Sequence, residues 1–124
     1  MERHAVMFTV RPGSEEAVAE ILASYDRPAA EIDESTRLIG TTVFMKGNIV
    51  VRVMDFEGRL DRVMAHLSQQ PTVRGVEERL NPYLEEPRDL SDPQGARQFF
   101  QRAMMRRITH RTAETQPKRA MHER

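Results

Sequence analysis

Apolar and polar positions near the start of the chain predict a strand followed by a helix. Residues 5–10 are almost wholly apolar or β-prone, which is typical of a strand covered on both sides. Residues 12–14, Pro-Gly-Ser, break this run, and Ser14 can cap a helix whose first turn holds two glutamates. We expect this helix to end at Arg27-Pro28. Its apolar positions recur at helical spacing: Val18, Ile21, Leu22 and Tyr25.

The centre of the chain carries the clearest local signal, that of a β-hairpin. Residues 38–46 and 49–56 are β-prone and flank Gly47-Asn48, a two-residue turn signal. A tight turn would place Lys46 opposite Ile49 and Val43 opposite Arg52. Because side chains alternate along a strand, one sheet face would carry Thr41, Val43, Met45, Val50, Arg52 and Met54. The other face would carry Thr42, Phe44, Lys46, Ile49, Val51 and Val53.

The second half of the chain predicts helices on either side of Pro71, then a strand and a last helix. The stripe before Pro71 consists of Leu60, Val63, Met64 and Leu67, and the stripe after it of Val73, Val76 and Leu80. Residues 81–84 predict a fourth strand at the sheet edge, because Pro82 has no N–H for a ladder. After a loop, residues 96–108 predict a helix with an apolar side formed by Phe99, Phe100, Ala103 and Met104.

This order of elements indicates an α+β fold, the ferredoxin-like split βαβ with a four-stranded antiparallel sheet and an extra C-terminal helix. Helices cover one sheet face, but the other face is also apolar and must be buried, and within the chain only the C-terminal helix is left to cover it. We therefore expect a homodimer that packs sheet face against sheet face. The expected organisation is a domain over 1–87, a loop and helix over 88–109 that pack on the domain or the partner, and a disordered basic tail over 110–124.

Composition and charge narrow the function classes. The 124 residues carry a formal net charge of zero, which gives no electrostatic case for nucleic acid or a membrane surface. From Arg102 onward, seven basic residues face two acidic ones, which leaves net +5 there and −5 in the preceding 101 residues. The chain has no cysteine, which excludes disulfides and thiolate catalysis. No secretory signal or long apolar run is visible, so we expect a cytoplasmic protein.

Four segments together carry a family resemblance: HAVMFTVRPGSEE, IGTTVFMKGNIVVRVMDFEG, QPTVRGVEERLNPYLEE and GARQFFQRAMMRRITHR. Residues 3–87 resemble the small polyketide cyclases of the tetracenomycin type. The closing stretch is more specifically similar to the SchA/CurD-like proteins of bacterial spore-pigment and aromatic-antibiotic gene clusters. The resemblance implies a dimeric α/β-barrel with a pocket between sheet and helices for a poly-β-ketone or partly cyclised polyphenol. It implies no metal and no cofactor.

Arg52 and Asp26 are the candidate catalytic residues. Intramolecular aldol cyclisation needs a base, a donor for the developing enolate and a shaped apolar pocket. A guanidinium mid-strand among apolar residues is costly unless it is paired or faces a polar cavity. The resemblance matches Arg52 to a cavity position where relatives often show histidine, and Asp26 to an acidic position near the cavity. Since arginine does not deprotonate, Arg52 would stabilise charge, and Asp26 would act as base or orient Arg52.

Each of these two residues also has a structural interpretation. Arg52 could instead form a salt bridge across a dimer interface or extend its head group to solvent. Asp26 could be an ordinary aspartate at a helix end before a turn.

Six further residues are candidates for substrate binding: Tyr25, Tyr83, His4, His66, Met45 and Met54. The tyrosines could hydrogen-bond a polyketide carbonyl, although each could equally be an amphipathic core residue. His4 could reach a cavity mouth, and His66 lies off its helical stripe and is more typical of a surface. Methionines suit an adaptable pocket. No pair of histidines has a metal-ligand spacing.

Three functions remain open from the sequence. The first is a cofactor-independent polyketide cyclase. The second is a cofactor-free monooxygenase of the same fold that consumes dioxygen on an anthrone-like substrate. The third is a non-catalytic accessory dimer of a type II polyketide synthase. The basic residues Arg102, Arg106, Arg107 and Arg111 could form a solvated face or dock an acidic acyl-carrier protein.

Overall fold

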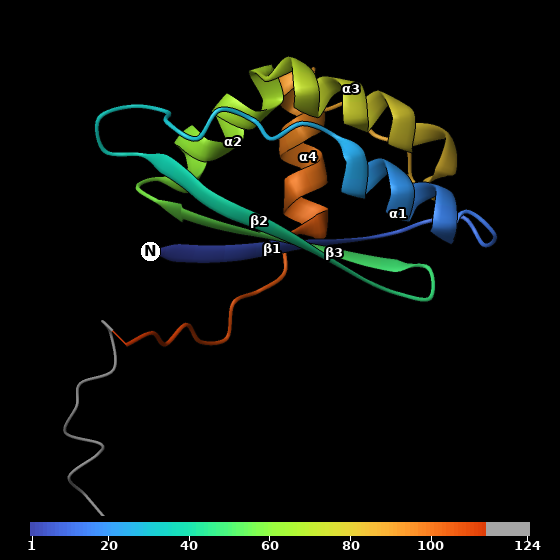
Figure 1. The fold of residues 1–124 in the computed structure, drawn as a ribbon, viewed down its shortest axis with the longest axis horizontal. Helices are drawn as coiled ribbons and strands as arrows, with labels where there is room; N and C mark the ends of the chain where they lie inside the picture. The colour runs from blue at the N-terminus through green and yellow to red at the C-terminus, as the bar shows by residue number, and fades with distance from the viewer. Residues whose placement is uncertain (114–124) are drawn as a thin grey trace, which may run out of the picture.

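A three-stranded antiparallel sheet carries the helices of the molecule on one of its faces (Figure 1). The computed structural model describes residues 1–113. Within them the strands are β1 (Glu2–Thr9), β2 (Arg37–Lys46) and β3 (Ile49–Glu57), in the order β1-β3-β2. The helices are α1 (Glu15–Ser24), α2 (Leu60–Gln69), α3 (Pro71–Leu80) and α4 (Pro93–Ala103). The α+β class is therefore confirmed, with β3 as the central strand.

The predicted hairpin and its register are confirmed. Lys46 lies opposite Ile49 and Val43 lies opposite Arg52 across a turn in which Gly47 has a φ of 56°. That left-handed conformation favours glycine and matches the twist of a tight hairpin. The register shifts between Leu38 and Gly40, where a bulge bends the start of β2. The register therefore places the two sets of alternating side chains as the sequence predicted.

Strand β1 begins at Glu2, three residues earlier than predicted, and it is covered on one face only. Val6 lies opposite Arg52 on the face that the helices cover and is 5% exposed. Met7 points to the other face and is 43% exposed. The expectation of a strand covered on both sides is therefore wrong for the single chain.

The predicted fourth strand is also wrong. Asn81–Tyr83 forms a short 3-10 helix, and only Leu84 makes a β-bridge, to Val10 at the end of β1. The Asn81 side chain explains the turn, because its amide donates to the Arg88 carbonyl (2.7 Å) and its oxygen accepts from the Arg88 N–H (3.0 Å). The chain thus turns away from β1 after one bridge.

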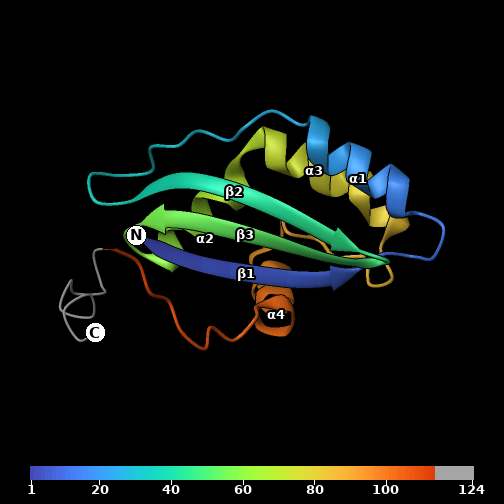
Figure 2. The ribbon, with the colours of Figure 1, turned by 60° about the horizontal axis from the view of Figure 1, so that its bottom comes forward.

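Helix α4 lies over β1, on the same face as the other helices (Figure 2). It is shorter than predicted and begins after Asp92, whose carboxylate accepts from the Gly95 N–H (3.1 Å) and caps the helix. Phe99 and Ala103 pack against Val6. Beyond α4 the chain runs along the outer edge of β1, and the Met105 N–H donates to the Ala5 carbonyl (2.8 Å).

Packing of the helices on the sheet buries three neighbouring apolar clusters. The largest lies between the sheet, α1 and α3, and it includes Val18, Val50 and Leu80, each 0% exposed. Among residues 1–113, nothing covers the opposite face of the sheet (Figure 2), and Met7, Phe44 and Ile49 are exposed there. The predicted homodimer stays a prediction, and the expected disorder of the tail falls largely on residues 114–124, outside the described part of the chain.

Within residues 1–113, none of the helices is long and apolar enough to cross a membrane.

Candidate active site

Arg52 projects from the middle of β3 into the layer between sheet and helices. Its Nη1 donates to Glu77 Oε1 at 2.8 Å, and its Nη2 donates to Tyr25 Oη at 3.3 Å. The Arg52 side chain is 18% exposed. Both partners belong to the same chain, so the structural alternative of an arginine paired across a dimer does not apply to these bonds. Arg52 is therefore a half-buried guanidinium that is paired within its own chain.

Glu77 is shared between two arginines. It lies on the buried side of α3, 5% exposed, at the end of the helical spacing that begins with Val73 and Val76. Its second oxygen, Oε2, accepts from Arg88 Nε at 3.0 Å and lies 2.9 Å from Arg88 Nη2. Arg88 Nη2 is nevertheless poorly aligned with that oxygen and has no hydrogen bond within the described residues.

Two phenylalanine rings hold Arg88 in place. Its guanidinium carbon lies 4.3 Å from the centre of the Phe8 ring and 4.1 Å from the centre of the Phe99 ring. These contacts bring together β1, α4 and the loop before α4. A guanidinium between two ring faces is attracted by both, and more so when it is shielded from water. Arg88 therefore fixes Glu77 from the side opposite to Arg52.

The cluster of Arg52, Glu77 and Arg88 carries a formal net charge of +1 in a buried position. Burial alone would lower the pKa of Arg52, but the Glu77 carboxylate and the Tyr25 oxygen more than offset it and raise that pKa. Burial lowers the pKa of Arg88, and repulsion from Arg52 adds to the effect while Glu77 opposes it. Both side chains remain guanidinium ions at neutral pH. The unbalanced positive charge suits a ligand that carries or develops negative charge.

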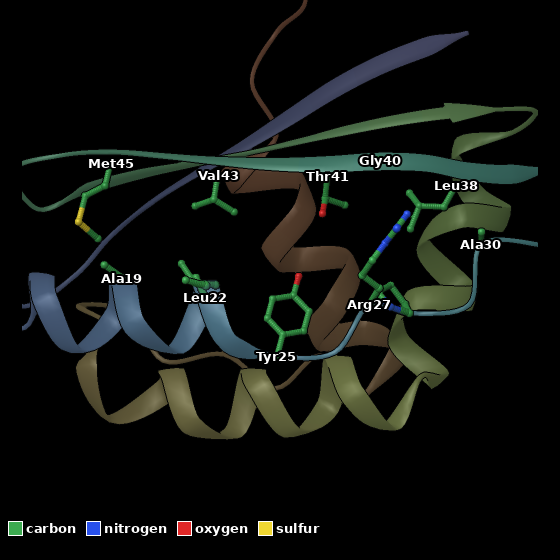
Figure 3. Close-up of a pocket in the computed structure, with 12 residues that line it drawn as sticks. Ala19, Leu22, Tyr25, Arg27, Ala30, Leu38, Gly40, Thr41, Val43 and Met45 are labelled. Carbon is green, nitrogen blue, oxygen red and sulfur yellow. The ribbon is translucent and has the colours of Figure 1, made fainter.

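A cleft of about 390 Å³ lies beside this cluster, between β2, α1 and the segment that follows α1 (Figure 3). Its walls are mainly apolar and include Leu22, Val43 and Met45. Tyr25 and Arg27 rise from the end of α1 toward β2 and supply polar groups. Arg52 lies opposite Val43 on the neighbouring strand and is connected to the cleft through the Tyr25 hydroxyl.

Tyr25 reaches the cleft because α1 ends earlier than predicted. The helix stops at Ser24, and Tyr25 has extended backbone angles, φ −89° and ψ 155°. The following Arg27-Pro28 pair lines the cleft instead of ending the helix. With this extended backbone, the Tyr25 side chain points from the end of α1 toward β2 (Figure 3).

The structure brings some of the predicted site residues together and separates others. Arg52 and Tyr25 are bonded, Met45 lines the cleft, and Met54 lines a small interior void that also contacts Arg52 and Glu77. Asp26 is exposed and lines, with Thr72 and Arg79, a shallow depression that adjoins the cleft at Tyr25. The side-chain hydrogen bonds of Arg52 go to Glu77 and Tyr25, and none within residues 1–113 goes to Asp26, so a role for Asp26 in orienting Arg52 stays a prediction. A role for Asp26 as a base stays a prediction.

The remaining candidates lie away from the cleft. His4 stacks on Phe56 with ring centres 5.6 Å apart. His66 Nε2 lies 2.8 Å from the Ala29 carbonyl and ties α2 to the segment after α1. Tyr83 packs against the core cluster under α1 and α3. Their predicted contact with substrate stays a prediction that this geometry does not favour.

Sequence reasoning missed Glu77, Arg88 and Arg27. Glu77 had a usable signal, since it follows Val73 by four positions and so falls on the buried stripe of α3. A carboxylate on such a stripe calls for a partner of opposite charge, and Arg52 was available. Arg88 lies in a loop, and no periodic pattern marks it. In residues 1–113 no group of three or more His, Asp or Glu side chains is placed to hold a metal ion.

Comparison with known sequences identifies close relatives. The family model described as SchA/CurD-like domain matches residues 1–113. The chain is 56% identical over 108 residues to polyketide synthase CurD of Streptomyces cyaneus, covering 87% of this chain and 29% of that protein. It is 53% identical over 110 residues to a 42.8 kDa protein in the whiE locus of Streptomyces coelicolor, covering 89% and 28%. Protein SchA of Streptomyces halstedii is 45% identical over 108 residues, covering 87% and 28%. The chain thus spans less than a third of these relatives.

Comparison with solved structures identifies a shared fold. Tetracenomycin F2 cyclase from Streptomyces glaucescens, described as a type-II polyketide cyclase, matches with a TM-score of 0.53 and 15% sequence identity. The match covers 91% of this chain and 99% of that chain. At this identity the likeness concerns the fold alone.

Proposed function

Because the chain belongs to the SchA/CurD-like domain family, we propose that it serves aromatic polyketide biosynthesis as a cofactor-independent cyclase. Its substrate would be a poly-β-ketone or a partly cyclised aromatic polyketide, and its reaction an aldol-type ring closure with loss of water. One observation carries this proposal: a half-buried guanidinium, Arg52, is held by Glu77 and Tyr25 beside an apolar cleft. The fold shared with a polyketide cyclase supports it.

The geometry gives Tyr25 and Arg52 complementary tasks. The Tyr25 oxygen accepts a hydrogen bond from Arg52, so its own hydrogen is free to donate to a substrate carbonyl in the cleft. The adjacent guanidinium polarises that O–H and stabilises negative charge on the carbonyl oxygen as an enolate forms. Such preorganised donors favour the transition state over the neutral ground state. Glu77 holds Arg52 in the required orientation.

The base can be weak in this chemistry. A methylene group between two carbonyls of a poly-β-ketone gives up its proton more readily than an isolated ketone does, because the enolate charge spreads over both oxygens. Arg52 cannot accept that proton, and the Glu77 carboxylate is occupied by two guanidiniums. Stabilising the enolate is therefore the main contribution of the cluster, and Asp26 stays the proposed base.

The cleft has a volume suited to such a substrate. Ligand pockets in proteins have volumes of about 300–1,000 Å³, and the cleft falls in the lower part of this range with about 390 Å³. Its apolar walls would hold a folded carbon chain while Tyr25 and Arg27 contact carbonyl oxygens. Holding the two reacting carbons together lowers the entropic part of the barrier.

Dimerisation is part of the same proposal. The open sheet face carries Phe44 at 61%, Met7 at 43% and Ile49 at 41% exposure. A second copy of the chain would bury this face by packing against it, as the apolar pattern on both faces of the hairpin predicts.

Reconstitution tests the proposed reaction. A type II synthase that makes a poly-β-ketone is incubated with and without the protein, and the products are identified by mass spectrometry. We expect the protein to shift the products toward one ring pattern, and Tyr25→Phe to weaken that shift. An oxygen electrode in the same assay separates ring closure from oxygenation, because a cyclase consumes no dioxygen. An unchanged product pattern, or oxygen uptake that depends on the protein, would contradict the cyclase proposal.

A further inference from the structure

A second, larger hollow lies on the other side of the Arg52 cluster, between α2 and α4. Both helices cover the same sheet face (Figure 1), and the groove between them has a volume of about 660 Å³. Its walls are mainly apolar, with Met64 and Ala65 from α2, Phe100 from α4 and Met104 directly after α4. This groove shares no lining residue with the cleft beside Tyr25.

A small interior void connects the groove with the charged cluster. The void has a volume of about 60 Å³, and it shares four lining residues with the groove: Met64, Ser68, Leu90 and Phe100. Its inner wall includes Arg52, Glu77 and Met54. The shared residues therefore stand between an open apolar slot and the buried charges, with Arg52 at the inner end.

The residues that line the groove and the void indicate which kind of ligand would bind there. The groove offers an aromatic ring and two methionines, whose sulfur atoms make favourable contacts with aromatic rings. The inner end is lined by the Arg52 guanidinium and by Glu77, whose second oxygen pairs with Arg88 outside the wall of the void. The void is too small for a ring, but it is large enough for an oxygen substituent. A flat aromatic body with a phenolic or phenolate oxygen at one edge matches both ends.

We propose that the groove between α2 and α4 binds a planar aromatic polyphenol whose oxygen points through the void toward Arg52. Arg52 would then face two compartments, with the flexible poly-β-ketone in the cleft beside Tyr25 and a rigid cyclised molecule in the α2–α4 groove. This inference rests on the proposed function, because that function makes a cyclised polyphenol a ligand of the protein. Met64 and Phe100, both half-buried, would have to shift to admit the oxygen.

Four methionines can report separately on ligand binding in the cleft, the void and the groove. Met45 lines the cleft, Met54 the void, Met64 both void and groove, and Met104 the groove. The full-length chain is labelled with 13C at the methionine methyl groups, the signals are assigned by single Met→Leu changes, and 1,8-dihydroxyanthraquinone is titrated. We expect saturating shifts of the Met64, Met104 and Met54 signals. Shifts confined to Met45 would overturn the groove while leaving the proposed cyclase intact, and no saturable shift at all would count against both.

A variant at the junction tests the connection. Ser68 lies where groove and void meet, and Ser68→Leu would fill that junction on a helix that tolerates leucine. We expect it to remove the shift of Met54 and weaken binding about tenfold while the Met104 shift persists. The control is Gln69→Leu, which lies in the groove wall but not in the void and should keep the Met54 shift. An undiminished Met54 shift in Ser68→Leu, or equal shifts with dodecanoate in place of the polyphenol, would overturn the proposal.

Discussion

Both faces of the sheet carry apolar residues, but the two faces differ in how far these residues are exposed to solvent. On β3, Val50, Met54 and Phe56 face the helices and are 6% exposed or less, while Ile49 on the same strand faces outward at 41%. The covered face also holds Arg52, the charged side chain in the middle of β3. Arg52 donates hydrogen bonds to Glu77 and Tyr25 of the same chain. The open face combines apolar residues with the Arg3–Asp55 ion pair and Lys46, and nothing in residues 1–113 covers it. The covered face thus carries a polar site inside a finished core, and the open face has the character of an interface.

Two phenylalanines, one on each face, allow the sharpest test of this difference. Phe56 is 0% exposed and Phe44 is 61% exposed. Phe56→Ala removes a fully buried ring, and we expect it to lower the free energy of unfolding by about 3–5 kcal/mol. Phe44→Ala should change the unfolding of the single chain by about 0.5 kcal/mol or less, because little buried area is lost. Urea unfolding at low protein concentration measures both.

Phe44 also tests the proposed interface. Light scattering after size-exclusion chromatography should show a shift from dimer to monomer for Phe44→Ser, whereas Thr9→Ser on β1 should leave the mass unchanged. A wild-type chain that is monomeric at high concentration would contradict the proposal for the open face.

We expect the next effect on stability from Glu77, the carboxylate that Arg52 and Arg88 share. Glu77→Gln leaves Arg52 and Arg88 buried together without a counter-charge. Loss of one partner from a buried ion pair costs about 3–5 kcal/mol, and we expect a loss of this size in chemical unfolding. The matched control is Glu78→Gln at the neighbouring exposed position. Equal stability of the two variants would show that the cluster is not held by charge.

Arg88 should matter less than Glu77, although both are buried. Arg88→Met keeps Arg52 and Glu77 as a neutral pair and replaces the guanidinium between Phe8 and Phe99 with an apolar chain. The loss of its contacts with two rings should cost about 2 kcal/mol. Arg102→Met, exposed on α4, serves as the control in thermal unfolding. A larger loss for Arg88→Met than for Glu77→Gln would contradict the excess of positive charge in the cluster.

The smallest effect on stability is expected in the loop before α4, away from both faces of the sheet. The Ser91 hydroxyl and N–H donate to Asp89, which lowers the pKa of that carboxyl. A lowered folded-state pKa stabilises the fold above the unfolded pKa, and this contribution is lost as the pH falls through that range toward the folded value. Stability of Asp89→Asn should therefore fall less between about pH 5 and pH 3 than that of the wild type. Glu86→Gln is the control. If the wild type and Asp89→Asn lost stability equally as the pH falls, the stabilising role of the Asp89 carboxylate would be refuted.

The sequence predicted the parts of the fold that depend on local signals. Gly47-Asn48 fixes the hairpin, and alternation then places Arg52 on the same face as Val50 and Met54. The prediction of a fourth strand was wrong, because a contact that no sequence pattern marks decides the conformation there. The Asn81 side-chain amide pairs with the Arg88 backbone and turns the chain. Apolar content on both strand faces could not show which face the single chain would cover.

The candidate site was predictable in its centre but not in its partners. A guanidinium mid-strand marked Arg52, because a charge among apolar residues requires an explanation. Its partners Glu77 and Tyr25 lie 25 and 27 positions away, and only the packing of α1 and α3 on the sheet brings them together. One residue also separates Tyr25 from Asp26. The extended backbone after α1 directs the first toward the cleft and leaves the second on the surface.

The rate of ring closure by Arg52→Met tests the central proposal most directly. The substitution removes the guanidinium but leaves Glu77 paired with Arg88, so the cluster becomes neutral and the fold should survive. Arg52 polarises the Tyr25 hydroxyl that donates to the developing enolate, and weakening one such preorganised donor lowers a rate by up to about 10²–10³-fold. We predict a loss of this size in the reconstituted synthase, with partial activity in Arg52→Lys and an unchanged circular dichroism spectrum for both. A folded Arg52→Met variant that forms the ring at the wild-type rate would contradict the role assigned to this arginine.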